Sequence, residues 1–554
     1  MTMATRQAIL VASMFTLAAA SAVRADIAVI DERFNEWGAD DLVAIDPIGD
    51  APGGAFDLGR VWAKTAGTTL FLSFEMLGQT VNLQSGHLSD GGPQLWIGVQ
   101  DGDDLSVFFR PRFVTLGDID DPSALFGAPR LAWDAVDFAL LPTVAASRYE
   151  MRIDLSPAGV NPGDTVLLDF ATPTLAGSPG SVPTDFESPD ALSSPVAITL
   201  APLPAPSPSG DESELVARPQ GTTLRVASLN TLRSGLTNTF PPAVASFDRL
   251  LRVAAADVYC FQEQAGTPQQ LIDRLAAADP RGDGASWNVH TDPQGGLFSS
   301  DYIATPLPLT PVEDPPLTNA YAAGVVGTDP ETAVLVLSVH PKCCGFVGSF
   351  EDQLRIAEAE DIRDMLARFR TGVISPSLVP FKDVPVIVIG DWNLVGSNGP
   401  REILTDQASG TGLRHQVLLN LDGRDATSWR DLSPSPGGFA PGLLDLAVHS
   451  SRSLDVTGGF VLDSHRLTPS QRTAIGVDAS DSLVSDHLLL VADYRPMIAA
   501  LDIDADGVLA IGDITDYLGD LVDGLPGAEW NDDLVVDAFD GAEFVDLFAH
   551  WAIE

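Results

Sequence analysis

The sequence is poor in cysteine and in basic residues. Only three cysteines occur in 554 residues, which excludes a protein held together by a framework of disulfides. Lysine and arginine together number 31 against 76 acidic residues, so the formal net charge is -45. This balance excludes a protein that coats nucleic acid through a broad basic surface, so an acidic substrate would have to be bound locally. The acidic excess suits either a calcium-rich or saline exterior or simple solubility.

Long hydrophobic runs are also scarce, and the clearest one lies at the N-terminus. Arg6 precedes an apolar segment, residues 8–20, which is followed by small residues suited to cleavage. This order predicts a signal peptide over residues 1–25, cleaved before Val23 or Asp26, and hence a secreted or cell-surface protein. An uncleaved anchor is the alternative, although the segment is short for a membrane span. No transmembrane span is expected elsewhere.

The chain length predicts about three or four domains. Residues 26–195 contain short alternating runs separated by Gly, Pro and Asp, which predict an N-terminal all-β sandwich. The opening segment DERFNEW loosely resembles β-sandwich carbohydrate-binding-like modules of exported enzymes, and this resemblance implies a glycan as its partner. Residues 196–221 are rich in Pro, Ser and acidic residues, which predicts a semi-rigid linker.

The most informative stretch begins at Val386. Four β-branched residues in a row predict a strand that is buried on both faces, and Gly390 ends the run. Asp391 and Asn393 follow, and two residues at this spacing in extended backbone point the same way. Open α/β sheets bind their ligands at this carboxyl edge of the strands. Taken alone, the pattern is equally typical of an Asx turn at a strand end.

From Thr222 onward, strands alternate with helices, and every predicted strand has a polar residue at its margin. A single such residue is ordinary turn chemistry, whereas six positions along one chain indicate a functional site. Besides 391–393, the positions are Asn230, Gln262-Glu263, His340, Asp445 and Ser485-Asp486-His487.

In this order, these residues resemble the endonuclease/exonuclease/phosphatase superfamily, which includes deoxyribonuclease-I-like nucleases, apurinic endonucleases, bacterial sphingomyelinases and inositol polyphosphate 5-phosphatases. The resemblance covers residues 222–496. It implies a central α/β four-layer sandwich, made of two packed β-sheets flanked by helices. It also implies hydrolysis of a phosphate ester, most simply a phosphodiester, with nucleic acid as one substrate of this kind.

The resemblance assigns the metal and phosphate ligands. Glu263 and Asp486 would bind Mg²⁺ or Mn²⁺ through hard carboxylate oxygens. Asn230 would orient the metal site and contact the phosphate. Asn393 would donate its amide to a phosphate oxygen.

The resemblance also assigns the groups that move protons. Asp391 would position or deprotonate the attacking water. Asp445 would fix the tautomer of His487 and raise its pKa, so that a cation faces the phosphate. His340 would be the second donor, on the side of the leaving group.

The sequence departs from the family at one point. Nucleases of the family often support the first histidine with a Glu between the second and third motifs, and here only Asp292 and Asp301 occur in that segment. Neither fits well, which places the general-acid role of His340, and the nuclease activity with it, in question.

Three alternatives to an enzyme that hydrolyses a large nucleic acid therefore stay open. Arg233, Lys342 and Arg355 could bind a smaller substrate. A sphingomyelinase-type or phosphomonoesterase activity is the alternative within the family. A non-catalytic surface-binding or scaffold protein with a vestigial catalytic domain is the alternative outside it.

The segment 502–554 predicts a small α-helical tail with a calcium loop. The pattern of the loop requires oxygen ligands at alternate positions and a final carboxylate at the twelfth position. Its ligands would be Asp502, Asp504, Asp506, the carbonyl of Val508, and Asp513. The second half of the tail is degenerate. This tail resembles dockerin-like and EF-hand-like segments, which implies Ca²⁺ and a cohesin-like or cell-surface partner, whereas an acidic turn without calcium is the alternative.

The cysteines are distributed unevenly. Cys260 lies in a predicted buried strand, and Cys343 and Cys344 are adjacent in a predicted loop. The adjacent pair is either a vicinal disulfide or two ordinary thiols.

Overall fold

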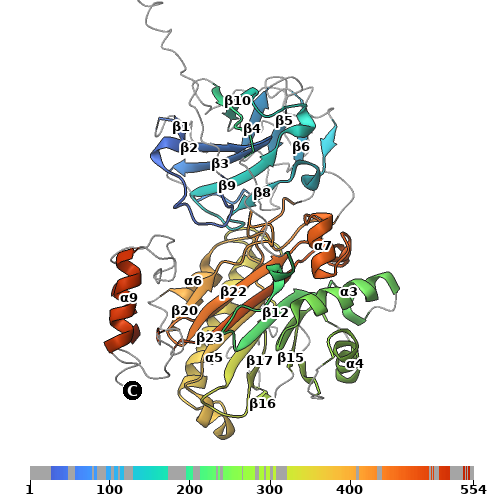
Figure 1. The fold of residues 1–554 in the computed structure, drawn as a ribbon, viewed down its shortest axis with the longest axis vertical. Helices are drawn as coiled ribbons and strands as arrows, with labels where there is room; N and C mark the ends of the chain where they lie inside the picture. Colours follow the sequence, from blue (N-terminus) through green and yellow to red (C-terminus); the bar gives the residue numbers. More distant parts are fainter. Residues whose placement is uncertain are drawn as a thin grey trace, which may run out of the picture.

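The structure is a computed structural model of the chain (Figure 1). It describes residues 27–47, 57–77, 80–83, 95–100, 105–109, 113–117, 129–171, 195–203, 212–232, 235–237, 241–264, 266–280, 286–291, 295–299, 303–306, 321–406, 411–432, 439–497, 501, 503, 511–523, 541–542, 544–545 and 547–548. The predicted signal peptide lies outside these residues. So do Asp292, Asp301 and the calcium-loop residues Asp502, Asp504, Asp506 and Val508. No helix within the described ranges is both long and apolar enough to cross a membrane.

The front part of the chain, residues 27–200, forms two antiparallel sheets, drawn at the top of Figure 1. Its strands are β1 (Leu42–Ile45), β2 (Asp57–Ala66), β3 (Thr69–Leu77), β4 (Trp96–Gln100), β5 (Leu105–Phe108), β6 (Phe113–Leu116), β7 (Arg130–Leu131), β8 (Ala139–Leu141), β9 (Arg148–Asp154), β10 (Thr165–Ala171) and β11 (Val196–Thr199). One sheet has the order β1-β2-β3-β9-β8 and the other β11-β10-β4-β5-β6-β7. A single hydrophobic cluster contains side chains from both sheets.

Strand β11 corrects the predicted boundary of the linker. The sequence predicts that residues 196–199 belong to the linker, because Pro and Ser dominate the stretch that follows. In the structure they pair with β10 in antiparallel register, from Val196 opposite Leu168 to Thr199 opposite Thr165. The front sheet therefore includes this short apolar run.

The central part contains two more sheets. Their strands are β12 (Leu224–Asn230), β13 (Val258–Gln262), β14 (Asn288–Thr291), β15 (Gly295–Ser299), β16 (Ile303–Pro306), β17 (Tyr321–Val326), β18 (Val334–Val339), β19 (Val386–Asp391), β20 (Leu413–Gln416), β21 (Asp445–Ser450), β22 (Leu454–Leu462) and β23 (Leu489–Pro496). The orders are β14-β15-β13-β12-β23-β22 and β16-β17-β18-β19-β21-β20. Strands β12 and β13 are parallel, as are β18 and β19.

Helices cover the outer faces of both central sheets (Figure 1). The helices are α3 (Pro241–Ala254), α4 (Pro268–Ala278), α5 (Phe350–Arg370), α6 (Gly399–Thr405) and α7 (Pro469–Ile475). Helices α3 and α4 share a hydrophobic cluster with the first central sheet, and α5 shares one with the second. A third cluster lies between the two sheets. Two packed sheets flanked by helices are therefore present, as predicted from the sequence.

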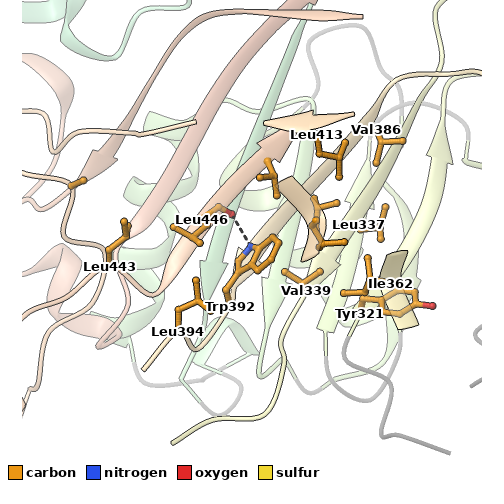
Figure 2. Close-up of a cluster of buried hydrophobic side chains, with 14 of the residues drawn as sticks. Tyr321, Leu337, Val339, Ile362, Val386, Trp392, Leu394, Leu413, Leu443 and Leu446 are labelled. Carbon is orange, nitrogen blue, oxygen red and sulfur yellow. Dashed lines mark hydrogen bonds between the residues drawn. The ribbon is translucent and has the colours of Figure 1, made fainter. Parts of the chain in front are cut away.

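Strand β19 shows how the β-branched run builds the centre of the fold. Val386 and Val388 pack in the cluster that includes α5, whereas Ile387 and Ile389 pack between the sheets. Figure 2 shows Val386 and Trp392 among the apolar side chains of the first of these clusters. Gly390 has a φ of +152°, and a Cβ at this position would collide with the backbone oxygen of Val339. Only glycine allows β18 and β19 to approach this closely.

The front and central parts share a hydrophobic core. Trp62, Phe71 and Leu141 of the front part belong to the same cluster as Trp392 and Leu443 of the central part. Strand β3 explains this, because Leu70 and Leu72 face the other front sheet while Phe71 points to the opposite face. The five-stranded front sheet is therefore apolar on both faces.

The tail contains helix α9 (Ile511–Asp523), which lies beside the central part in Figure 1. A small cluster that includes Met497, Tyr517 and Phe544 forms its core. Asp513 is buried, and its Oδ1 accepts a hydrogen bond of 2.8 Å from the backbone N–H of Ile503. Its role as a calcium ligand stays a prediction.

Candidate active site

The topology brings the polar strand ends to one edge of the central sandwich. Asn230 ends β12, Glu263 follows β13, His340 follows β18, and Asp391 ends β19. Because β12 and β13 are parallel, as are β18 and β19, each pair delivers two side chains to the same edge. The other three residues arrive at the starts of antiparallel strands. Asp445 lies opposite Asp391 in the ladder, and Asp486 and His487 lie just before β23, separated from it by Leu488.

Asp391 lies at the centre of this group. Its Oδ2 accepts hydrogen bonds from Asn230 Nδ2 at 3.1 Å and from Asn393 Nδ2 at 3.2 Å. The Nε2 atoms of His340 and His487 each lie 3.5 Å from the same oxygen. The Asp391 side chain is only 1% exposed, so this oxygen is accessible only from the space between these groups.

His487 is held as a cation by two carboxylates. Its Nδ1 lies 2.8 Å from Asp445 Oδ2, and both side chains are buried. Burial alone would lower the pKa of His487, but Asp445 and Asp391 outweigh it and raise the pKa to about 10. Burial raises the pKa of Asp445, and the charge of His487 opposes this. Ser428 Oγ holds the backbone of Asp445 by accepting a hydrogen bond of 2.8 Å from its N–H.

The two asparagines orient the carboxylates. Asn230 Nδ2 lies 3.4 Å from Glu263 Oε1 as well as near Asp391, so it bridges the two acids. Asn393 has a φ of +51°, a left-handed conformation that asparagine tolerates. Its Nδ2 donates to the Pro341 carbonyl at 3.0 Å and to Asp391. A phosphate oxygen would have to replace one of these acceptors in order to receive the predicted hydrogen bond from Asn393.

The residues predicted to bind metal have oxygen atoms suited to it. Asp486 Oδ2 accepts a hydrogen bond of 3.2 Å from Trp429 Nε1, whereas Oδ1 is buried without a hydrogen-bond partner among the described residues. A buried carboxylate oxygen in this state is costly, and a hard cation would satisfy it. Glu263 has a φ of +53°, and its side chain is 31% exposed. This donor set fits a divalent cation.

These residues surround a cavity of about 480 Å³. Glu263, His340, Asp391, Asp486 and His487 form its polar part. The cavity is also lined by five apolar residues, here called the apolar wall: Phe346, Val395, Trp429, Phe439 and Leu444. The sequence does not predict this wall, because its members come from separate loops that carry no periodic pattern.

The front part reaches this cavity as well. Thr143 lines it, and Thr143 Oγ1 accepts a hydrogen bond of 2.7 Å from the N–H of Leu443, two residues before Asp445. Asn82 Nδ2 donates to the carbonyl of Val395 at 2.6 Å. The sequence predicts a separate front module, and the structure corrects this prediction, because the front part holds two segments of the cavity wall.

The structure corrects one predicted contact with substrate. Arg355 is fully buried in α5, and its Nη1 donates to the carbonyls of Lys342 and Cys344 at 2.9 and 2.6 Å. It therefore holds a loop and does not face the cavity. Lys342 is exposed, and Arg233 lies outside the described residues.

Comparisons with known proteins give distant likenesses only. No protein-family model matches the sequence, and no curated protein matches it. Solved structures of similar shape include the human Nocturnin catalytic domain with bound sulfate, which is 18% identical. It covers 50% of this chain and 96% of its own, with a TM-score of 0.33.

Two further structures are similar to the same degree. An endonuclease/exonuclease/phosphatase from Beutenbergia cavernae is 18% identical and covers 49% of this chain and 71% of its own, with a TM-score of 0.30. The 3′ phosphatase NExo from Neisseria, bound to product DNA hairpin, is 15% identical. It covers 49% of this chain and 100% of its own, with a TM-score of 0.31. The side chains of the cavity, rather than these likenesses, carry the functional conclusion.

Proposed function

We propose that the chain is an exported, divalent-metal-dependent phosphoesterase of the endonuclease/exonuclease/phosphatase type, which hydrolyses phosphodiester bonds. One observation supports this most directly. A single buried oxygen, Asp391 Oδ2, is in contact with two amides and two imidazoles in a cavity that also contains Glu263 and Asp486. Hydrolysis of a phosphate ester calls for a proton acceptor, hydrogen-bond donors and oxygen ligands for a metal, and this cavity brings all three together.

Each residue has a role in this proposal. A divalent cation held by Glu263 and Asp486 would neutralise charge on the phosphate oxygens. Asp391 Oδ2 takes the proton of the attacking water once that water replaces one of the two asparagine amides that donate to this oxygen. His487 donates to a phosphate oxygen as a cation. His340 donates to the leaving oxygen.

The apolar wall bears on the choice of ester. Phe346, Trp429 and Phe439 would favour an alcohol that carries a flat or apolar group next to the phosphate. A nucleoside and a lipid both meet this requirement, so a nuclease and a sphingomyelinase-type enzyme are the two main outcomes to separate.

A substrate screen of the full chain tests the proposal. The purified protein is assayed with Mg²⁺, Mn²⁺ or a chelator against DNA, RNA, a nitrophenyl phosphodiester, sphingomyelin and phosphomonoesters. We expect metal-dependent hydrolysis of at least one diester. In Asp391→Asn its kcat should fall by about a hundredfold or more, the usual scale for a lost proton acceptor. Asp364→Asn, on the outer surface of α5, is the matched control.

Two results would contradict the assignment. If no ester is hydrolysed under any metal condition, a binding or scaffold protein becomes the better description. If Asp391→Asn retains the parent rate while folded, the reaction takes place elsewhere.

Export, the tail and the front part belong to the same proposal. The order of residues 1–25 supports secretion, and N-terminal sequencing of protein recovered from culture medium would show whether cleavage occurs before Val23 or Asp26. The acidic spacing after Asp502 supports Ca²⁺ in the tail and a cohesin-like or cell-surface partner. A glycan stays the proposed ligand of the front part.

A further inference from the structure

The loop between β18 and α5 places two thiols on the wall of the cavity. Cys343 and Cys344 both line it, together with His340. Their Sγ atoms lie 2.9 Å apart, and neither thiol is buried. Cys260, by contrast, is fully buried between the central sheets.

The backbone of this loop is fixed on both sides of the pair. Arg355 Nη1 donates to the carbonyls of Lys342 and Cys344, which bracket Cys343. Glu358 Oε2 accepts a hydrogen bond of 2.8 Å from the backbone N–H of Lys342. Cys344 has a φ of +71°, a conformation that bulky residues adopt rarely, and Gly345 follows at +81°. The loop therefore holds the two sulfurs together on the cavity side.

We propose that Cys343 and Cys344 form a redox-active dithiol site, which low-molecular-weight disulfides oxidise to a vicinal disulfide. The Cys343 thiolate attacks one sulfur of the small disulfide and releases one thiolate. Cys344 then attacks the mixed disulfide and releases the second. The protein loses two electrons and two protons, and the small disulfide is reduced to two thiols.

The local chemistry favours a reversible bond. Adjacent Cα atoms are about 3.8 Å apart, closer than the roughly 4.4 to 6.8 Å of relaxed disulfides, so a bond between neighbours is strained and readily reduced. The hydrogen bond from Cys344 lowers the pKa of Cys343, which favours the attacking thiolate. Both features suit a site that changes with the redox state of its surroundings rather than a structural cross-link.

A redox titration of the full chain tests the proposal. The protein is equilibrated in buffers of reduced and oxidised glutathione, trapped with N-ethylmaleimide and digested with trypsin. Cleavage after Lys342 and Arg355 releases a peptide, 343–355, which contains both adjacent cysteines and not Cys260. We expect this peptide to change from two maleimide adducts to an unlabelled form that is lighter by two hydrogens. Cys260 should stay labelled after denaturation.

Single variants separate the site from general thiol chemistry. Cys343→Ser and Cys344→Ser should each leave one thiol that forms a stable glutathione adduct, whereas Cys260→Ser should titrate as the parent does. Phenylarsine oxide, which requires two neighbouring thiols, should bind the reduced parent and Cys260→Ser but neither of the other two variants. Two maleimide or two glutathione adducts on the parent peptide in every buffer would overturn the proposal.

Discussion

The guanidinium of Arg152, in the front sheet, lies 2.6 Å from the carboxylate of Asp425, in the central part, and both side chains are buried. Arg466 Nη1 contacts the same carboxylate at 2.7 Å. Burial alone would raise the pKa of Asp425, but the two arginines outweigh it and hold the pKa below its usual range. The front and central parts are therefore joined by a charged contact as well as by a shared core.

Removing the charge of Asp425 should destabilise the whole chain. Asp425→Asn removes the carboxylate that Arg152 and Arg466 share, whereas Arg152 keeps Asp137 and Arg466 keeps Asp422. The cost should therefore lie below the about 3–5 kcal/mol of a buried charge that loses its partner altogether. Denaturant unfolding should show this loss in the free energy of unfolding. Asp383→Asn is the control, because the side chains of the Lys382–Asp383 pair are 45% and 79% exposed and their loss should leave the midpoint unchanged. Equal midpoints for both variants would show that the interface tolerates the loss.

The Asp445–His487 pair predicts a pH dependence. His487 has a pKa of about 10 in the folded chain, above the roughly 6.5 of a free histidine. The protonated imidazole therefore contributes its full stabilisation below about pH 6.5, and this contribution is lost as the pH rises through 10. In Asp445→Asn the imidazolium loses its hydrogen-bonded counter-ion and keeps the charges of Asp391 and Asp486, so its pKa should fall. We expect the alkaline limb of the kcat/KM profile to move to lower pH. A profile identical to that of the parent would show that His487 does not act as a cation.

Thr143 should influence catalysis from the front part. Thr143→Val removes the acceptor for the N–H of Leu443 and leaves that group unsatisfied, at a cost of about 1–3 kcal/mol. Because Leu443 leads directly to Asp445, we expect a reduced kcat and a lower midpoint of thermal unfolding. Thr143→Ser keeps the hydroxyl and should resemble the parent. Similar behaviour of the two variants would remove Thr143 from the positioning of the site.

Trp429 should affect metal affinity without contacting the metal. Its Nε1 holds Asp486 Oδ2, and the loss of such a supporting hydrogen bond typically costs about 10- to 100-fold in metal affinity or activity. In Trp429→Phe, calorimetry should show weaker Mg²⁺ binding, and the Mg²⁺ concentration for half-maximal activity should rise. Phe439→Leu, elsewhere on the apolar wall, should change KM for the ester rather than the metal requirement. Unchanged Mg²⁺ binding in Trp429→Phe would argue against Asp486 as a ligand.

The tail should bind calcium independently of the cavity. Asp502→Ala combined with Asp504→Ala removes two of the predicted ligands, and we expect the full-length variant to lose a calorimetric Ca²⁺ signal that the parent shows. Asp516→Ala, on the exposed face of α9, is the control. Ester hydrolysis should stay within about twofold of the parent, since the proposed catalytic residues all precede Pro496. A parent that gives no Ca²⁺ signal would reduce the segment to an acidic tail.

The sequence predicts the central fold and its strand-end residues because their signals are local. The run before Asp391 predicts a buried strand, and parallel pairing brings Asn230 and Glu263 to one edge of the first sheet and His340 and Asp391 to one edge of the second. The contact of Thr143 with Leu443 could not be predicted, because it joins residues 300 positions apart and leaves no periodic trace. Arg355 was assigned to the substrate because its charge is visible in the sequence, whereas its burial depends on how α5 packs.

The pairing of β19 with β21 gives the apolar core an indirect part in catalysis. Asp391 faces Asp445 across this ladder, and a shift of one residue would turn Asp445, and its bond to His487, to the opposite face of the sheet. The alternation of Val386 and Val388 with Ile387 and Ile389 between two different clusters prevents such a shift. A volume change at Ile387, far from any reacting group, could therefore appear first as an altered pH profile rather than as a lower melting temperature.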